Sequence, residues 1–337
     1  MKYKGILLGM LTGLLLISCT KEPVLTLRGE TMGTFYTIKV CGAGTGDEKV
    51  RIQTTVDSVL MAVNASLNTY DPESEISKFN DCKKRTVYSF SSHFMYVTEI
   101  ADSVHKISEG AFDPGISRLV DLWGFGKKSI LRIPDSLAIS RNRERAGMDN
   151  IQILENGILK KDPGLKLDYA AIAKGYGVDV LFRKIQKQGF KNLLVEIGGE
   201  VRAGGKCNGR PWQIGIAVPG TDNTGNRNFS GIIALQNMAC ATSGDYQQFY
   251  EFEGKRYSHL INPKTGYPIE HELTSVSVIA EECIFADALA TAAIVMGKHK
   301  GLKMIESLDG VEAYFIYRDR RGGLQPLAST GWGKYRK

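Results

Sequence analysis

Apolar residues recur every three or four positions in several segments of the chain, the spacing of an amphipathic helix. In residues 47–67 the stripe consists of Val56, Val59, Leu60, Val63 and Leu67. The same period predicts five helices, over residues 47–67, 91–108, 170–188, 284–296 and 302–308.

Runs of β-branched and aromatic residues between these helices predict strands. We expect strands at 24–27, 34–40, 151–154, 158–160, 193–197, 212–218, 231–235, 274–280 and 311–317, and a short one that ends at Asp168. Residues 110–128 have the composition of a loop. Helices and strands are intermixed and several strands are adjacent, so an α+β fold is predicted rather than a regular βαβ repeat.

The first eighteen residues have the features of a bacterial export signal. Lys2 and Lys4 precede an apolar run over residues 6–17, which is shorter than the roughly 20 residues that span a bilayer. The run ends Leu16-Ile17-Ser18-Cys19, which resembles a bacterial lipoprotein box. We therefore expect cleavage before Cys19 and its acylation, residues 19–27 as a lipidated tether, and a lipid-anchored protein facing the periplasm or the outside. An ordinary secretory signal with a chance Cys is the alternative.

The composition adds limits on the type of partner. Of the 337 residues, 43 are Lys or Arg and 36 are Asp or Glu, a net charge of +7 that becomes +5 without the first eighteen residues. The basic residues are scattered, which argues against nucleic acid and fits an anionic small ligand or a membrane surface. Six Cys residues fit no zinc spacing, and any disulfide pairing among them cannot be deduced.

Three segments carry features of a ligand site. Met32-Gly33 lies between two predicted strands and reads as a tight turn, and Tyr70 stands at a helix break before Asp71-Pro72. A ring such as Tyr70 could face a planar ligand or be half-buried core. Ala111, Phe112 and Asp113 lie among glycines, as in a ligand loop or a self-packed Ω-loop.

The segment from Leu165 to Asp179 is predicted to pass from a strand through small residues into a helix. The first N–H groups of such a helix suit a phosphate, and Lys174 is near enough to reach the same anion. Asp168, at the strand end, is placed to bind a base or a sugar hydroxyl. The segment matches neither a Walker loop nor G-x-G-x-x-G.

His259 precedes the rigid turn Asn262-Pro263-Lys264-Thr265-Gly266, and a loop His near its ordinary pKa can accept a proton from an attacking hydroxyl. A purely structural role for His259 is the alternative. No comparable turn follows any of the other His residues. We expect His93, His105 and His299 on a solvated surface.

A carboxylate and a hydroxyl interrupt the very apolar helix 284–296. Asp287 and Thr291 are one turn apart on the same face, and burying them is costly unless something binds them. Two hard oxygen ligands in this arrangement suit Mg²⁺. Alternatively, Asp287 caps the helix and Thr291 bonds back to a carbonyl.

In this order and spacing the segments resemble the ApbE family of FAD:protein FMN transferases, from about Arg28 to Gly333. The resemblance implies an ApbE-like (T-fold-like) α+β domain over residues 28–335, with mixed sheets, packed helices and an FAD cleft between two lobes. It implies Mg²⁺ binding by the Ala171 carbonyl, Asp287 and Thr291, and catalysis by His259. The implied FAD-binding residues are Met32, Tyr70, Ala111, Phe112, Asp113, Asp168, Lys174, Thr242, Ser243 and His259.

The resemblance also implies the reaction: transfer of FMN from FAD to a Thr or Ser hydroxyl of a flavin-carrying subunit of a membrane redox complex, with release of AMP. Asn262 and Lys264 replace an Asp and an Arg that are frequent in the family, which puts the role of Asn262 in doubt. Three alternatives stay open: hydrolysis of FAD to FMN and AMP, FAD binding without catalysis, and a lipoprotein that binds another nucleotide-like solute.

Overall fold

The computed structural model describes residues 21–83, 85–126, 133–155, 157–218, 229–245 and 249–337. The expected signal, residues 1–18, and the expected lipidation site, Cys19, lie outside these residues. Within the described part of the chain, no helix has the length and apolarity that crossing a membrane requires.

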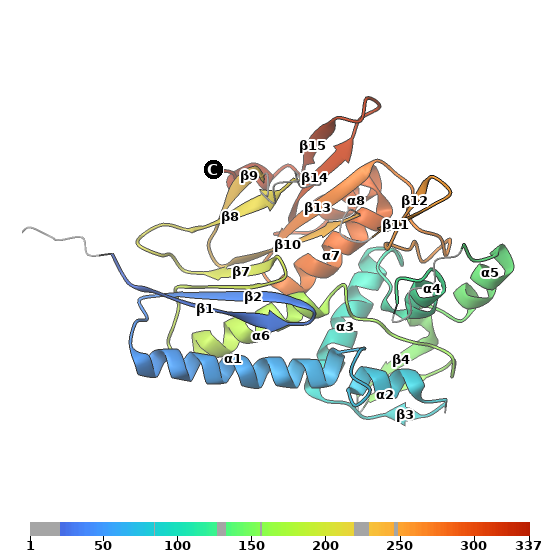
Figure 1. Cartoon of the computed structure of the whole chain (residues 1–337), viewed down its shortest axis with the longest axis horizontal. Helices are drawn as coiled ribbons and strands as arrows, with labels where there is room; N and C mark the ends of the chain where they lie inside the picture. The colour runs from blue at the N-terminus through green and yellow to red at the C-terminus, as the bar shows by residue number, and fades with distance from the viewer. Residues whose placement is uncertain (1–20, 84, 127–132, 156, 219–228, 246–248) are drawn as a thin grey trace, which may run out of the picture.

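An eight-stranded sheet forms the centre of the molecule (Figure 1). Its strands follow one another in chain order across the sheet, and every neighbouring pair is antiparallel. They are β1 (Val24–Thr31), β2 (Thr34–Cys41), β6 (Leu193–Ile197), β7 (Glu200–Gly204), β10 (Met238–Gly244), β13 (Leu273–Ala280), β14 (Glu312–Arg318) and β15 (Leu324–Ala328). Strands and helices are intermixed along the chain, so the predicted α+β class is confirmed.

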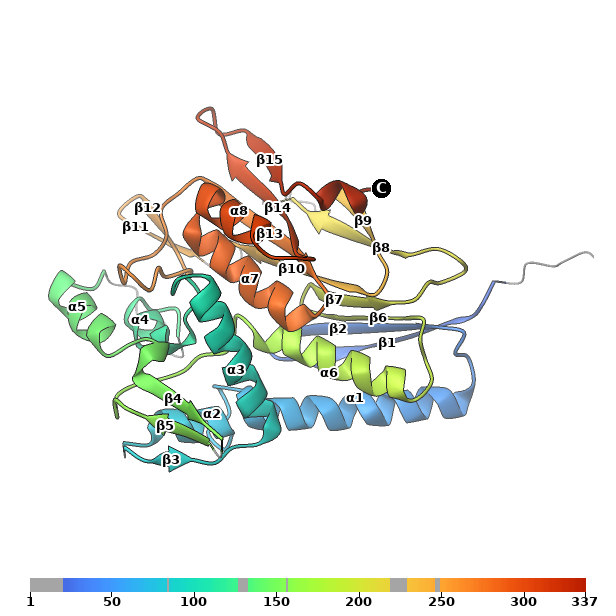
Figure 2. The ribbon, with the colours of Figure 1, turned by 180° about the vertical axis from the view of Figure 1, so that it is seen from behind.

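Four helices cover one face of this sheet, as Figure 2 shows from behind. They are α1 (Gly46–Leu67), α6 (Ala173–Lys187), α7 (Cys283–Met296) and α8 (Lys298–Glu306). The α7 helix is apolar on nearly every side, as expected of a helix packed between a sheet and other helices. The main hydrophobic core lies between these helices and the sheet and extends beyond them to residues such as Phe79, Phe94 and Ile158.

The opposite face of the sheet is covered by a hairpin and the C-terminal segment. The hairpin consists of β8 (Trp212–Ala217) and β9 (Phe229–Leu235), and η3 (Trp332–Lys334) packs with it. A disulfide joins Cys41, the last residue of β2, to Cys207. The sequence had left this pairing open.

A second lobe lies beside the C-terminal ends of α1 and α7. It contains a three-stranded sheet, a hairpin, one helix of 16 residues and several shorter helices, and has a small apolar cluster of its own around Trp123. Its elements are α2 (Glu75–Asp81), β3 (Val87–Tyr88), α3 (Ser92–Ile107), η1 (Pro114–Ile116), α4 (Ser117–Leu122), α5 (Ser136–Glu144), η2 (Met148–Asn150), β4 (Ile151–Leu154), β5 (Gly157–Lys160), β11 (Phe249–Phe252) and β12 (Lys255–Ser258).

The predicted helices and most predicted strands are present, with ends that differ by a few residues. The prediction of a strand before Asp168 was wrong: residues 165–169 form a loop held by Asn80, whose side chain bonds both the N–H and the carbonyl of Leu167. The α6 helix begins at Ala173 rather than residue 170, because Ile172 has a non-helical φ of −150°. Residues 110–128 contain η1 and α4, so they are not wholly loop.

Candidate active site

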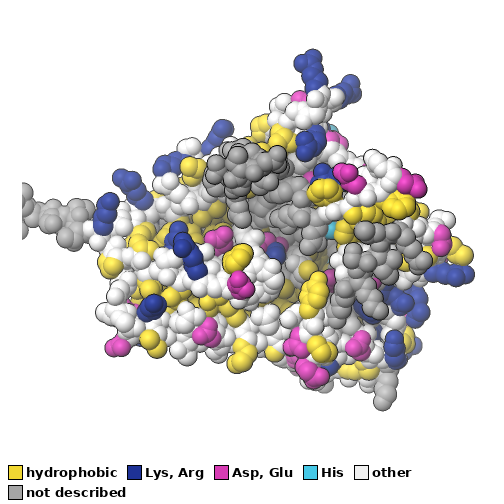
Figure 3. All heavy atoms as spheres, in the orientation of Figure 1, with side chains coloured by type: hydrophobic (Ala, Val, Ile, Leu, Met, Phe, Trp, Pro, Cys, Tyr) yellow, Lys and Arg dark blue, Asp and Glu magenta, His cyan; other side chains and the backbone are white. Residues whose placement is uncertain are grey.

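A cavity of about 790 Å³ lies where the two lobes meet. Its volume is within the range of about 300–1,000 Å³ that is usual for small-molecule sites. On the face drawn in Figure 3, hydrophobic side chains form a band across the middle while Lys and Arg side chains lie mostly at the edges. The residues predicted from sequence all line this one cavity: Met32, Tyr70, Ala111, Phe112, Asp113, Asp168, Ala171, Lys174, Thr242, Ser243, His259, Asp287 and Thr291.

The turn between β1 and β2 places Met32 at the cavity. Met32 and Gly33 have φ values of 50° and 70°, so the predicted tight turn is a two-residue hairpin loop with both central residues at positive φ. A β-carbon at Gly177 of α6 would lie 3.0 Å from Met32 Cε. Gly177 therefore lets the helix approach the turn closely.

Tyr70 extends from the segment that follows α1. Asn68 caps the end of that helix, and its side-chain oxygen accepts from the Tyr70 N–H at 3.0 Å. Tyr70 is 73% exposed, which excludes the half-buried core position considered as an alternative. It therefore offers an accessible ring at the cavity.

Asp113 lines the cavity, but its carboxylate binds the protein itself. Oδ1 accepts from the Gly115 N–H at 2.7 Å and the Met148 N–H at 3.0 Å, and Oδ2 lies 3.4 Å from His105 Nδ1. Burial raises the pKa of Asp113, against the opposing effects of His105 and the two amides. This carboxylate holds the loop that carries Ala111 and Phe112.

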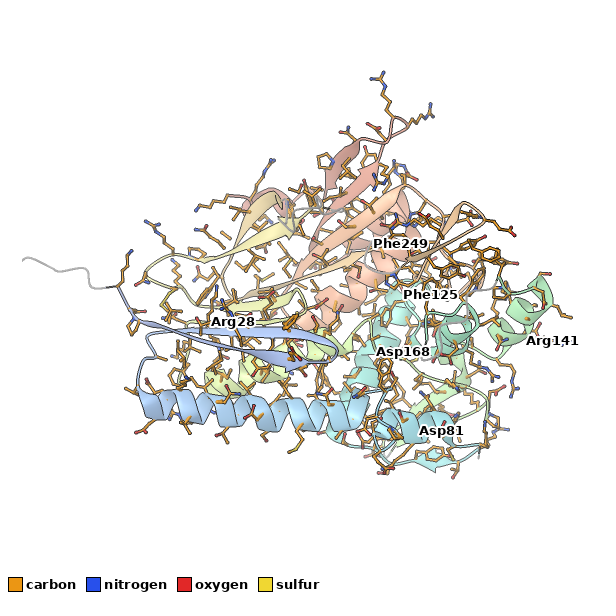
Figure 4. The ribbon with its side chains drawn as sticks, viewed as in Figure 1. Arg28, Asp81, Phe125, Arg141, Asp168 and Phe249 are labelled. Carbon is orange, nitrogen blue, oxygen red and sulfur yellow. A yellow bond between two sulfur atoms is a disulfide. The ribbon has the colours of Figure 1, made fainter. Side chains whose placement is uncertain are left out.

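The loop before α6 brings Asp168 and Ala171 to the cavity. The Asp168 N–H donates to Pro114 O at 2.8 Å, and Asp168 Oδ1 accepts from the Ala170 N–H at 2.9 Å. Figure 4 shows Asp168 near the middle of the molecule, where the two lobes meet. The expected free helix N-terminus is partly occupied, because the N–H groups of Ala173 and Gly175 donate to Tyr169 O and Asp287.

Glu200, which the sequence analysis missed, also lines the cavity. Its Oε1 lies 2.6 Å from Lys174 Nζ, and its buried Oε2 has no hydrogen-bond partner among the described residues. Burial raises the pKa of Glu200 to about 7, although Lys174 lowers it. Burial lowers the pKa of Lys174, but the Asp287 and Glu200 carboxylates outweigh this and raise it. The raised pKa keeps Lys174 charged.

The metal-ligand candidates on α7 fit a hard divalent cation. Asp287 is 3% exposed, and its Oδ2 accepts from the Gly175 N–H at 3.0 Å. It stands in the second turn of α7, so it is not the helix cap considered as an alternative. Thr291 Oγ1 lies 2.9 Å from Ser243 Oγ. With the Ala171 carbonyl, these groups supply a carboxylate, a hydroxyl and a carbonyl, the oxygen ligands that Mg²⁺ prefers.

Within the described residues, no group of three or more His, Cys, Asp or Glu side chains is arranged to hold a metal ion. The candidate set therefore depends on the hydroxyl and the carbonyl as well as on Asp287. Thr242, next to Ser243 on β10, lies 2.7 Å from Ser277 through its hydroxyl, and so belongs to the same polar wall.

His259 stands on the other wall, directly after β12. The edge of its ring faces Phe125, with ring centroids 6.3 Å apart. Figure 4 shows Phe125 beneath the strands that carry Phe249. The turn that follows is held by Asn262, whose side-chain oxygen accepts from the Lys264 N–H and whose carbonyl accepts from the Gly266 N–H. Asn262 therefore forms this turn without the carboxylate of the Asp that is frequent at this position in the family.

Comparison with known proteins agrees with this geometry. The family model described as "ApbE family" matches residues 32–315 of the chain. The chain belongs to the ApbE family.

Relatives of this family cover nearly the whole chain. The FAD:protein FMN transferase of Haemophilus influenzae is 38% identical over 326 residues, which cover 94% of this chain and 93% of the relative. That of Vibrio cholerae is 38% identical over 302 residues and covers 88% of this chain and 89% of the relative.

Solved structures of ApbE proteins have the same fold. The flavin transferase ApbE from Vibrio cholerae superposes with a TM-score of 0.83 at 35% identity, covering 93% of this chain and 99% of that one. The apo flavinyl transferase ApbE of Pseudomonas stutzeri gives a TM-score of 0.84 at 32% identity, covering 94% and 98%. The expected family and the ApbE-like fold are confirmed.

Two His residues of this ApbE protein are not where the sequence analysis placed them. His93 Nδ1 lies 2.6 Å from the Tyr176 hydroxyl, and burial lowers the pKa of His93. His105 lies against Asp113 with 15% of its side chain exposed. Both were expected on a solvated surface, but His93 faces α6 and His105 faces the loop that carries Phe112 and Asp113. His299 is exposed, as expected.

Proposed function

We propose that this ApbE-family chain transfers FMN from FAD to a Thr or Ser hydroxyl of a partner protein, with Mg²⁺ bound, and releases AMP. The observation that carries the proposal is the convergence of the predicted residues on one cavity, with the Asp287–Thr291 pair on one wall and His259 on another. The named activity of the relatives supports the same conclusion.

The pyrophosphate of FAD resists attack because its oxygens are negative. Lys174, kept charged by two carboxylates, supplies a cation in the cavity wall. Asp287, Thr291 and the Ala171 carbonyl would hold Mg²⁺, which supplies further neutralisation of phosphate oxygens and of the leaving group. Tyr70 and Met32 offer apolar surface for the rings of FAD, and Phe112, which is only 2% exposed, lines the same cavity.

His259 accepts the proton of the attacking hydroxyl in this proposal. A bond forms between the acceptor oxygen and the phosphorus of the FMN half, and the bond from that phosphorus to the bridging oxygen breaks. The electron pair leaves with AMP, and the acceptor proton passes to the imidazole. The product is a phosphoester between FMN and the partner.

We propose further that the protein acts outside the cytoplasm, at a membrane, through a lipid on Cys19. The Cys41–Cys207 disulfide supports an oxidising compartment. The acceptor would then be a flavin-carrying subunit of a membrane redox complex, which shares that surface.

The test uses the protein from Thr20 onward with FAD, Mg²⁺ and a candidate flavin-carrying subunit. AMP release and in-gel fluorescence of the subunit are measured. We expect a fluorescent band that is lost with EDTA or in Asp287→Ala, but is kept in Asp309→Ala, which removes an exposed carboxylate from a surface turn. AMP and free FMN formed equally fast without acceptor would establish a hydrolase instead, and absence of AMP would leave an FAD-binding protein.

A further inference from the structure

The N-terminus of α7 is capped by a residue from another helix. Glu282 occupies the N-cap position, where its side chain makes no capping hydrogen bond with the described residues. Asp179 of α6 takes this role instead. Its Oδ1 accepts from the Cys283 N–H at 3.0 Å, and its Oδ2 accepts from the Ile284 N–H at 2.9 Å. These are the first two amides of α7, which have no partner within the helix itself.

The capping carboxylate is fully buried and is paired with a cation. Asp179 has no exposed surface, and Arg202 Nη1 of β7 lies 2.6 Å from its Oδ1. The Arg202 guanidinium packs over the Phe182 ring at 4.7 Å. Burial raises the pKa of Asp179, and Arg202 and the two amides act against that rise. Three donors thus converge on one carboxylate between α6, α7 and the sheet.

This contact is linked to the candidate metal site by helix geometry. Gly175, one turn before Asp179 on α6, donates its N–H to Asp287, one turn after Cys283 on α7. The two helices are therefore joined at successive turns, at 179 with 283–284 and at 175 with 287. Fixing the first turn of α7 fixes both its position along the axis and its rotation, and so the direction in which Asp287 and Thr291 point.

We propose that Asp179 is a positioning residue for the metal site: by capping α7 from outside, it orients the Asp287 and Thr291 ligands. The inference rests on the proposed metal site. A negative charge at the N-terminus of α7 also interacts favourably with the positive end of the helix dipole. Groups that orient metal ligands typically change metal affinity by about 10–100-fold when they are altered.

Asp179→Asn is the sharpest variant because it preserves side-chain volume. The amide has one acceptor and one donor group, whereas three donors meet at this position, so at least one contact is lost. Ser329→Ala is the matched control. Ser329 is a buried hydroxyl that accepts from the Ala313 N–H at 2.9 Å, next to β14 and outside the cavity lining.

Two measurements on the protein from Thr20 onward test the inference. Hydrogen exchange of peptides covering residues 282–287 reports the cap, and electron paramagnetic resonance of free Mn²⁺ during a titration reports the metal affinity. In Asp179→Asn we expect faster exchange at residues 283–284 and Mn²⁺ binding weakened at least 10-fold. In Ser329→Ala we expect both to match the wild type, even where its melting temperature falls.

Flavin transfer at rising Mg²⁺ gives a third readout. For a positioning residue, the Mg²⁺ concentration at half-maximal rate rises while the rate at saturating Mg²⁺ is largely restored. Faster exchange with unchanged Mn²⁺ affinity would overturn the inference and leave the metal site intact. A wild-type protein that binds no Mn²⁺ would refute the metal site itself, and the inference with it.

Discussion

Replacing Gly175 by Ala is expected to destabilise the protein, although the same change in most helices is favourable. Gly175 lies in the first turn of α6, against α7. A β-carbon there would lie 2.5 Å from the carbonyl oxygen of Cys283 and 2.8 Å from Asp287 Cβ. The first of these neighbours is backbone, so no side chain can rotate away to relieve the contact.

The magnitude follows from the distances. Restoring an ordinary contact in place of 2.5 Å requires the two helices to separate locally by roughly 1 Å. Overpacking of this kind costs about 1–3 kcal/mol. The separation also weakens the bond from the Gly175 N–H to the Asp287 carboxylate, a kind of bond worth about 1.5–3 kcal/mol. Ala gains about 1 kcal/mol in helix propensity, which leaves a net loss of about 1.5–5 kcal/mol.

Thermal unfolding measures the sign directly, and we expect a midpoint lower by about 3–10 °C. Gly46→Ala is the control. Gly46 opens α1 with nothing within 4 Å of its β-carbon position, so the change should be neutral or slightly stabilising. Mn²⁺ binding should weaken in Gly175→Ala alone. If Gly175→Ala melted at or above the wild-type temperature, the close approach of α6 and α7 would not be a constraint.

Three further results are expected. Cys41→Ser with Cys207→Ser, or reductant added to the wild type, should lower the melting temperature, since a bridge closing 166 residues stabilises by up to about 5 kcal/mol; an unchanged melt would contradict this. The free energy of unfolding of the wild type relative to Glu200→Gln should fall as the pH rises from about 4.5 to about 7, because the folded protein holds the Glu200 proton more tightly than the unfolded chain does. Denaturant titrations at several pH values measure this difference. A difference that does not change with pH would show that the pKa of Glu200 is not raised. Burial lowers the pKa of Lys160 from 10.5 to about 8. The free energy of unfolding of the wild type, measured relative to that of Lys160→Met, should therefore rise as the pH is raised from about 8 to about 10.5, because the unfolded chain then binds more protons than the folded protein. A difference that stays constant over this pH range would refute the shift.

The elements with strong periodic patterns were predictable from sequence. The α1 helix has a clean apolar stripe and a capping box at Thr45 and Glu48, and its span agrees with the prediction within one residue. The β7 and β10 strands were missed because their sequences, EVRAG and MACATSG, are rich in small residues and lack the alternation typical of strands. What makes them strands is pairing in the middle of the sheet, which is a long-range interaction.

The candidate site shows the same division. Asp287 and Thr291 were detectable because a polar pair in an apolar helix is conspicuous. Glu200 was not, since one carboxylate after Gly198-Gly199 resembles any exposed hairpin. Only the structure shows that these two glycines have positive φ values of 64° and 109°. It also shows that Lys174 Cδ lies 3.3 Å from the position a β-carbon would take at Gly198. The available signal was a Gly-Gly-Glu turn directly after the predicted strand that follows the predicted phosphate-binding helix.

The sequence segment from Asp168 to Asp179 illustrates why a motif can be located before its parts are understood. Asp168 lines the cavity, whereas Asp179 is buried against the first turn of α7 and does not line the cavity. Between them, Gly175 and Gly177 lack side chains because α7 and Met32 pack directly against α6. In the proposed function, the start of α6 would contact the ligand on one side, and on the other side it holds α7, which carries the proposed metal ligands. Lining the cavity and packing closely against α7 both involve the same few turns of α6. For this reason the sequence of this segment departs from an ordinary amphipathic pattern.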